Sequence, residues 1–161
     1  MFKKIIVVVL LVVVFLFLYF FISKPYRVCG IDEEKSDCME PAIKDGQWCF
    51  VNHLYYMLNT YRAGDIIIFR HKHKIWISRI VGLENQEVKI TNNIILVNNK
   101  VYSDSIERSW KDWRYGYYGV DSVAKVPPGH IYVLSDNLSA HHDDSRVLGP
   151  ISYDNVLGKV L

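Results

Sequence analysis

The sequence predicts a mostly β domain with one N-terminal transmembrane helix. Residues 5–22 form a run of eighteen apolar residues without a charge, and short β-branched or aromatic runs follow it. A length of 161 residues leaves room for one anchor and one modest core. Half of the residues are hydrophobic, which argues against a disordered chain. The net charge is only +2, without a long basic stripe, so we expect no binding to nucleic acid.

The apolar run is long enough to cross a bilayer as a helix. Eighteen residues at 1.5 Å each reach about 27 Å, close to the hydrocarbon thickness of a membrane. A cleavable signal peptide is the alternative, but its apolar part usually has about 7–15 residues and ends at small residues. The sequence from Phe20 to Pro25 offers no such site, so we expect a retained anchor. Basic residues flank the run on both sides and leave its orientation open.

Residues 23–35 are expected to form a linker, because they contain Pro25, Gly30 and a cluster of charges at 32–35. The remainder of the chain alternates between turn signals and short runs that favour strands. Strands are predicted at 48–51, 66–69, 75–77, 88–90, 94–97 and 131–134. The domain should therefore be mostly β.

Two asparagine pairs predict tight hairpins, because asparagine tolerates the positive φ of primed turns. They are Asn92-Asn93 and Asn98-Asn99. Residues 102–125 differ from the strand pattern, with several Trp and Tyr residues among charges and glycines. We expect an irregular excursion there, whose aromatic rings are partly buried against the sheet or contact lipid.

Four motif-like segments follow one another beyond the linker. They are Ser36-Asp37-Cys38-Met39-Glu40-Pro41-Ala42, then residues 64–70, then residues 78–83, and last a composite of 127–130, 135–137, 144–146 and 149–150. In this order they resemble the conserved boxes of the type I signal peptidase family. The resemblance covers nearly all of the chain after the anchor.

The resemblance implies coiled, mostly antiparallel β-sheets with a hydrophobic surface against the outer face of the cytoplasmic membrane. It also implies that residues 1–4 are cytoplasmic, that residues 5–22 span the membrane and that residues 36–161 form an extracytoplasmic domain. The implied partners are the lipid bilayer and secretory preproteins, whose extended segment pairs with strands of the enzyme. No cofactor is implied.

Two positions depart from the family pattern. Cys38 falls on the family's nucleophilic serine, and Ser78 falls on its catalytic lysine. In the family a neutral lysine takes the proton of the serine hydroxyl, which requires that burial depress the lysine pKa. A serine hydroxyl has no useful basicity at neutral pH, so Ser78 cannot do this. Two alternatives remain.

In the first alternative, a Cys/His pair replaces the Ser/Lys pair. A thiol has a pKa of about 8.5, so it needs less help from a base than a serine does. In the family a serine two residues before the Asp-Ser-Arg motif lies near the lysine, and His142 stands at that place here, next to His141. Either histidine is a candidate base. Ser36 is a candidate oxyanion donor, together with the backbone N–H of Cys38.

In the second alternative, the protein is a non-catalytic member that binds preproteins or a partner enzyme. Cys38 is then an inert buried thiol or one half of a disulfide with Cys29 or Cys49, since thiols oxidise readily outside the membrane. His141 and His142 are then a solvated pair in a loop.

Several further residues are expected to shape or brace the site. They are Met39, Pro41, Arg79, Asp136, Asn137, Asp144, Ser145 and Arg146. Among them, Asp144 and Arg146 are expected to form an ion pair. His71 and His73 are weaker candidates for the base. We expect no metal site, because neither these histidines nor the run 141–144 has further ligands at a characteristic spacing.

Overall fold

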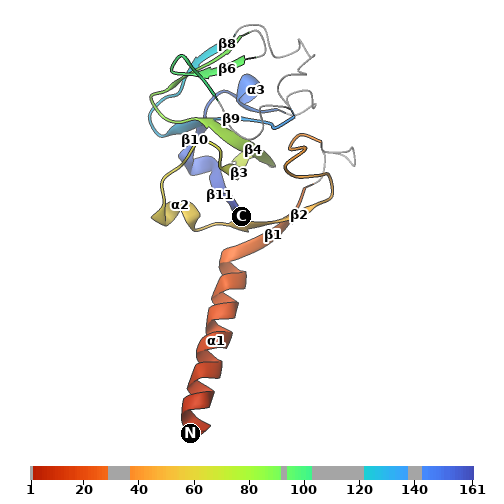
Figure 1. The fold of residues 1–161 in the computed structure, drawn as a ribbon, viewed down its shortest axis with the longest axis vertical. Coiled ribbons are helices and arrows are strands. Elements are labelled where there is room, and N and C mark those ends of the chain that lie inside the picture. Colours follow the sequence, from red (N-terminus) through yellow and green to blue (C-terminus); the bar gives the residue numbers. More distant parts are fainter. Residues whose placement is uncertain (1, 29–36, 92–93, 103–121, 138–142) are drawn as a thin grey trace.

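The computed structural model describes residues 2–28, 37–91, 94–102, 122–137 and 143–161. Helix α1 (Phe2–Ile22) continues directly into strand β1 (Ser23–Arg27), which joins it to the β domain (Figure 1). The described apolar side chains of α1 are all exposed. Within the described residues, no helix combines the length and the hydropathy needed to cross a membrane.

A seven-stranded antiparallel sheet forms the body of the domain. Its strands lie in the order β1-β2-β11-β3-β4-β9-β10. Beyond β1, they are β2 (Trp48–Asn52), β11 (Val156–Val160), β3 (Ile66–His71), β4 (Lys74–Gly82), β9 (His130–Leu134) and β10 (Ile151–Ser152). The C-terminal strand β11 therefore lies inside the sheet, between β2 and β3.

A four-stranded antiparallel sheet lies at the end of the domain farthest from α1 (Figure 1). Its strands are β7 (Lys100–Val101), β6 (Ile94–Val97), β5 (Glu87–Thr91) and β8 (Ser122–Lys125). Three short helices complete the described elements: α2 (Tyr55–Leu58), α3 (Ser145–Leu148) and the 3-10 helix η3 (Tyr153–Asn155). The mostly β, antiparallel fold predicted from the sequence is confirmed.

All six predicted strands are present. Four are one or two residues longer than predicted, β4 is six residues longer, and β6 has the predicted bounds. The hairpin at Asn98-Asn99 is confirmed, because both residues have positive φ, 50° and 63°. Strands β5 and β6 pair as the other hairpin requires, with Thr91 opposite Ile94, although the turn residues 92–93 lie outside the described part. Two segments differ from expectation: residues 23–27 of the expected linker form β1, and 122–125 form β8.

Side chains alternate across the large sheet and bury an apolar cluster against each face. One cluster includes Ile67, Phe69 and Ile80. The other, which we call the thiol cluster, consists of Val28, Cys38, Met39, Ile43, Cys49, Val51, Ile68 and Ile77. Consecutive residues of one strand therefore face different clusters, as the pleat requires.

Candidate active site

Cys38 lies at the start of a turn that precedes β2. Its side chain is only 2% exposed and packs in the thiol cluster, and that of Met39 is fully buried. The backbone closes the turn by a hydrogen bond from Ile43 N to Met39 O of 2.8 Å, and the Glu40–Pro41 peptide is cis. Met39 and Pro41 therefore shape the turn that carries the thiol.

Asn137, three residues after the end of β9, is hydrogen-bonded to Cys38 and to Asp37. Its backbone N–H donates to the carbonyl of Cys38 at 2.9 Å, and its side-chain amide donates to the carboxylate of Asp37 at 3.2 Å. The segment that follows Asn137 thus begins beside the thiol-bearing turn. Residues 138–142 themselves, including His141 and His142, lie outside the described part of the chain, as does Ser36.

Ser78 lies in the middle of β4, opposite Ile67 of β3. It is fully buried, and its hydroxyl donates to the carbonyl of Ile77 at 2.7 Å. The preceding residue, Ile77, belongs to the thiol cluster. A serine hydroxyl engaged with its neighbour's carbonyl supplies no base.

Arg79, the next residue of β4, is held by a planar set of hydrogen bonds. Its Nε and Nη2 atoms donate to the two carboxylate oxygens of Asp136 at 2.8 and 2.7 Å, and Nη1 donates to the carbonyl of Gly64 at 2.6 Å. Asp136 is fully buried, and the Arg79 side chain is 11% exposed. A bidentate pair of this geometry fixes the end of β9 against β4.

Asp144 and Arg146 form a second buried ion pair at the start of α3. The carboxylate of Asp144 accepts from Arg146 Nε and Nη2, each at 2.8 Å, and from Ser135 N at 3.0 Å. The hydroxyl of Ser145 accepts from Val133 N at 2.9 Å. These bonds satisfy backbone donors along the edge of β9 and lock α3 onto the sheet.

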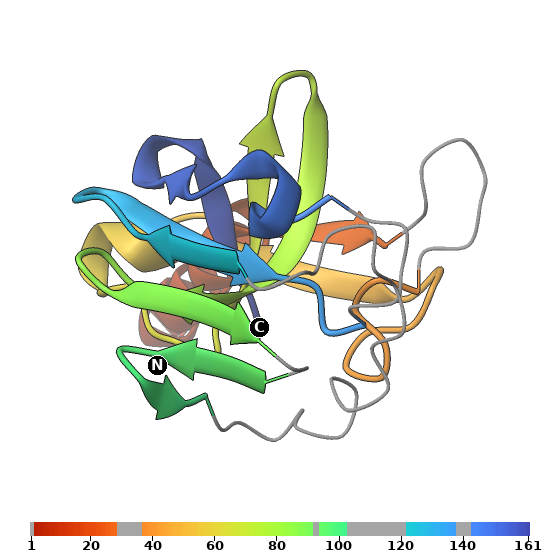
Figure 2. The ribbon, with the colours of Figure 1, turned by 90° about the horizontal axis from the view of Figure 1, so that it is seen from above.

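The two weaker candidates for the base lie on a hairpin away from the thiol cluster. His71 and His73 lie at the tip of the β3–β4 hairpin, which projects beyond the body of the domain (Figure 2). Ile77 of the thiol cluster lies four positions after His73 in the sequence, which corresponds to about 13 Å along a strand. These two histidines are therefore excluded from the site.

Lys159 is the lysine that lies nearest to Ser78 in the sheet register, two strands away opposite Ile67. Its ammonium pairs with Asp65 at 2.6 Å. Burial alone lowers the pKa of Lys159, but the hydrogen bond and the charge of Asp65 outweigh it and raise that pKa above its ordinary value. Lys159 stays protonated and cannot replace the missing base.

Cys38 and Cys49 are both buried thiols of the same cluster, and no disulfide joins them. The alternative in which a disulfide joins Cys38 to Cys49 is therefore wrong. Cys29, the other candidate partner of Cys38, lies outside the described residues. Burial raises the pKa of the Cys49 thiol, which makes Cys49 a poor nucleophile.

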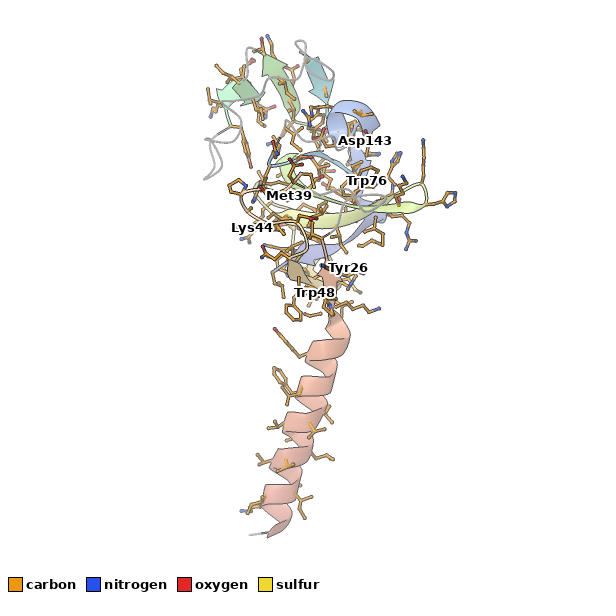
Figure 3. The ribbon with its side chains drawn as sticks, turned by 90° about the vertical axis from the view of Figure 1, so that its right-hand side faces the viewer. Tyr26, Met39, Lys44, Trp48, Trp76 and Asp143 are labelled. Carbon is orange, nitrogen blue, oxygen red and sulfur yellow. The ribbon has the colours of Figure 1, made fainter. Side chains whose placement is uncertain are left out.

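A small pocket of about 70 Å³ adjoins the thiol cluster. Its lining includes Val28, Cys49, Ile68 and Ile77, which also belong to that cluster. Tyr26, Arg27, Ile75 and Trp76 complete its lining, and Figure 3 shows Trp76 in the body of the β domain above the end of α1. Since one water molecule needs about 10–15 Å³ by the same measure, the pocket has room for a side chain.

Comparison with known proteins agrees with these motifs. The model of the family described as signal peptidase, peptidase S26, matches residues 1–161. The chain belongs to this family. Its members are serine-type hydrolases, and this chain is of the signal peptidase I type.

Individual relatives support the assignment. The chain is 33% identical over 131 residues to signal peptidase I of Bacillus caldolyticus, covering 76% of this chain and 71% of that protein. It is 27% identical over 153 residues to signal peptidase IB of Staphylococcus aureus, covering 87% and 76% of the two chains. The crystal structure of a signal peptidase I from Enterococcus faecalis superposes with a TM-score of 0.54 at 26% identity, over 64% of this chain and 97% of that one.

Sequence reasoning missed residues in and directly after β1 that line the small pocket. Tyr26 and Val28 lie in the segment expected to be a linker, and Pro25 disguises the strand. Pairing of β1 with β2, where Tyr26 lies opposite Cys49, brings them to the pocket. A proline is tolerated on an edge strand, so Pro25 does not exclude a strand there.

Proposed function

We propose that this protein is a membrane-bound signal peptidase that removes signal peptides from exported preproteins with Cys38 as its nucleophile. The observation that carries the proposal is the hydrogen bond from Asn137 N to Cys38 O. His141 and His142 follow Asn137 by four and five residues in the sequence, which supports their candidacy as the base. Asp144 fixes the chain just after them through its ion pair.

In the proposed reaction, His142 or His141 takes the thiol proton, and the Cys38 sulfur attacks the scissile carbonyl to form a tetrahedral oxyanion. The backbone N–H of Cys38 and the hydroxyl of Ser36 donate to that oxyanion. The imidazolium then protonates the leaving amine, which leaves a thioester on Cys38. Water activated by the same imidazole hydrolyses the thioester and restores the thiol.

Recognition of the preprotein is proposed to use the small pocket. An extended segment that pairs with a strand presents alternate side chains to one face, and the pocket admits a methyl-sized side chain next to the thiol cluster. Arg79 and Asp136 act as positioning residues, because they fix β9 and therefore Asn137 against Cys38.

The apolar run of α1 is proposed as the membrane anchor. Residues 1–4 then lie in the cytoplasm, and the β domain lies on the outer side of the cytoplasmic membrane. Its described apolar side chains are exposed along the helix, and such a surface favours lipid over water. Protease added to intact spheroplasts should remove the β domain from the outside. Full protection of that domain behind a sealed membrane would contradict the orientation.

A second candidate function is preprotein binding without cleavage. It is favoured by the environment of the two altered residues, because Cys38 is 2% exposed in an apolar cluster and Ser78 supplies no base. In that case the pocket and the bracing ion pairs present a groove that holds a signal peptide. Binding and cleavage are separated by the following experiment.

The deciding experiment incubates the full chain, in detergent, with a preprotein and compares it with Cys38→Ala. The first proposal expects a processed product from the wild-type chain and none from the variant. Val51→Ala is the matched control, because it shortens another buried side chain of the same cluster without lining the small pocket and should leave cleavage intact in the folded protein. Equal product from wild type and Cys38→Ala rules out Cys38 as the nucleophile. Binding of the preprotein without any product supports the second candidate.

A further inference from the structure

The tip of the β3–β4 hairpin carries five consecutive basic residues, which we call the basic tip. They are Arg70, His71, Lys72, His73 and Lys74. The arginine and the two lysines bring three positive charges, more than the net charge of +2 of the whole chain. All five side chains are exposed except that of His71, which is half-buried. No carboxylate in the described part of the chain pairs with the basic tip, so its charge is available to a partner.

The geometry of the turn does not explain these residues. The turn consists of Lys72 and His73, and Lys72 has a φ of 54°, in the region that glycine and asparagine favour. A second two-residue turn of the domain has asparagine at both positions, Asn98 and Asn99. A lysine kept in the less suitable backbone conformation indicates a function other than turn formation.

Arg70 lies on the face of the hairpin that carries the small pocket. Ile68 pairs with Ile77, and both belong to the thiol cluster and line the pocket. Two positions nearer the turn, Arg70 pairs with Ile75, which also lines the pocket. Because alternate residues of a strand share a face, the Arg70 side chain lies on the same face, at the outer end of the pocket. A second exposed guanidinium, that of Arg27, lines the pocket itself.

The thiol lies toward the opposite end of β4. The carbonyl of Cys38 accepts a hydrogen bond from Asn137 N. Asp136, the residue before, pairs with Arg79. Arg79 and the turn residue His73 are six positions apart, about 20 Å along a strand. An extended segment that begins at the thiol and lies over the pocket therefore reaches the basic tip after about four to six residues.

The basic tip points to the side of the domain and not toward the anchor. Seen along α1 in Figure 2, the hairpin projects sideways beyond the other strands. In Figure 1, β3 and β4 lie above the junction of α1 with β1. The proposed bilayer around α1 therefore lies below the basic tip, whereas a segment in the small pocket lies beside it. The electrostatic complement of the tip is a carboxylate in that segment.

We propose that the basic tip selects preproteins that carry acidic residues about four to six positions before the scissile bond. The Asp or Glu carboxylates contact Arg70, and Lys72 and Lys74 strengthen the positive potential around it. The inference rests on the proposed function, because it takes the small pocket as the site of a side chain on the amino-terminal side of that bond. It applies to cleavage and to binding without cleavage, since both begin with the same bound segment.

The test measures the affinity of three fluorescent peptides for the full chain in detergent by anisotropy, with Cys38→Ala to keep the peptides intact. All three have alanine around the scissile bond. One has glutamates four and six positions before the bond, one has glutamines there, and one has glutamates four and six positions after it. We expect the first to bind about three- to tenfold more tightly than the others at low salt, as two exposed charge pairs allow. In 1 M salt, where the Debye length is about 3 Å, this preference should disappear.

Two double variants with the same change of charge locate the effect. Arg70→Gln with Lys72→Gln should remove the preference. Lys100→Gln with Lys125→Gln, in the distant four-stranded sheet, should keep it. All four side chains are exposed, so both variants should fold.

Equal affinities for the glutamate and glutamine peptides would overturn the proposal, and so would a gain from glutamates placed after the bond. Failure of all three peptides to bind would overturn it as well. The salt dependence of the preference is measured without changing the basic tip and does not depend on how either double variant folds. A failed nucleophile would be seen differently, as a preprotein that gives no product with wild-type Cys38 while the preference for the first peptide remains.

Discussion

Ser78 and Arg79 are consecutive residues of β4, and they belong to two differently built regions of one site. Arg79 makes three hydrogen bonds, two of them to the fully buried Asp136. Ser78 is just as buried, but its hydroxyl bonds to the carbonyl of the preceding residue. The bracing region is thus tightly paired, whereas the lysine position holds a small and locally satisfied side chain.

The difference teaches which parts of such a site can change. Removing one member of a buried ion pair leaves the other charge in the protein interior, which costs several kcal/mol, so the brace resists substitution. A serine in place of a buried lysine leaves no unpaired charge and needs no compensating partner. The fold can therefore be kept while the reacting groups are exchanged.

The largest effect is expected from breaking the brace. Asp136→Ala leaves the Arg79 guanidinium without its carboxylate, so the free energy of unfolding should fall by about 3–5 kcal/mol. Arg70→Ala, on the exposed hairpin of the same sheet, should change it by less than about 0.5 kcal/mol. Denaturant titration of both variants measures the contrast. Similar stabilities for the two would mean that the Arg79–Asp136 pair is not a brace.

The next effect comes from restoring the family's lysine. Ser78→Lys puts a longer, ionisable side chain at a fully buried position, so it should cost about 2–4 kcal/mol of stability. Combined with Cys38→Ser, it should restore cleavage of a preprotein by the Ser/Lys route if only the reacting groups differ. A folded double variant without product would show that the substrate groove has diverged as well.

Lys159 offers a smaller, pH-dependent effect. Lys159→Met removes the ion pair with Asp65 and should cost about 1 kcal/mol at neutral pH. Because the folded-state pKa is raised above 10.5, the pair stabilises fully below that value and loses its contribution as the pH rises through the raised pKa. The stability gap between wild type and variant should therefore narrow above pH 10.5. A stability difference between wild type and Lys159→Met that stays constant above pH 10.5 would contradict a stabilising Lys159–Asp65 ion pair.

The smallest effect is expected at Ser78 itself. Ser78→Ala removes one local hydrogen bond and should cost less than about 1 kcal/mol, with no change in preprotein cleavage. Thermal unfolding and a cleavage assay check both parts. Loss of cleavage in a fully folded Ser78→Ala variant would give Ser78 a role in the reaction that its geometry does not indicate.

Local patterns in the sequence were sufficient for the central strands, because β-branched runs between turn residues determine them directly. They failed at β1, where proline and charges suit an edge strand as well as a linker, and at β11, whose glycine lies at a bulge. Gly158 is needed there because a Cβ would lie 2.6 Å from the carbonyl of Asn52, a contact that only the folded sheet creates.

The candidate site likewise contains residues that the sequence predicted and contacts that it did not. Motif order placed Arg79, Asp136, Asp144 and Arg146 near one another, and the expected Asp144–Arg146 ion pair is confirmed. The Arg79–Asp136 pair was not predicted. No local pattern links Asn137 to Cys38 or Tyr26 to the small pocket, because strands distant in the sequence make these contacts. The Lys159–Asp65 ion pair also depends on β11 lying between β2 and β3, which a single sequence does not encode in any short segment.

The most direct test of the account compares the two buried thiols, Cys38 and Cys49, by their rates of alkylation at about pH 6, read by mass spectrometry of the two peptides. An imidazolium beside Cys38 would lower the pKa of its thiol, so we expect it to react faster than a cysteine in an unfolded peptide. Cys49, whose pKa burial raises, should react far more slowly. Replacing His141 and His142 by alanine should abolish the advantage of Cys38. Alkylation of Cys38 no faster than that of Cys49, or unchanged in the histidine variant, would contradict the proposed pair.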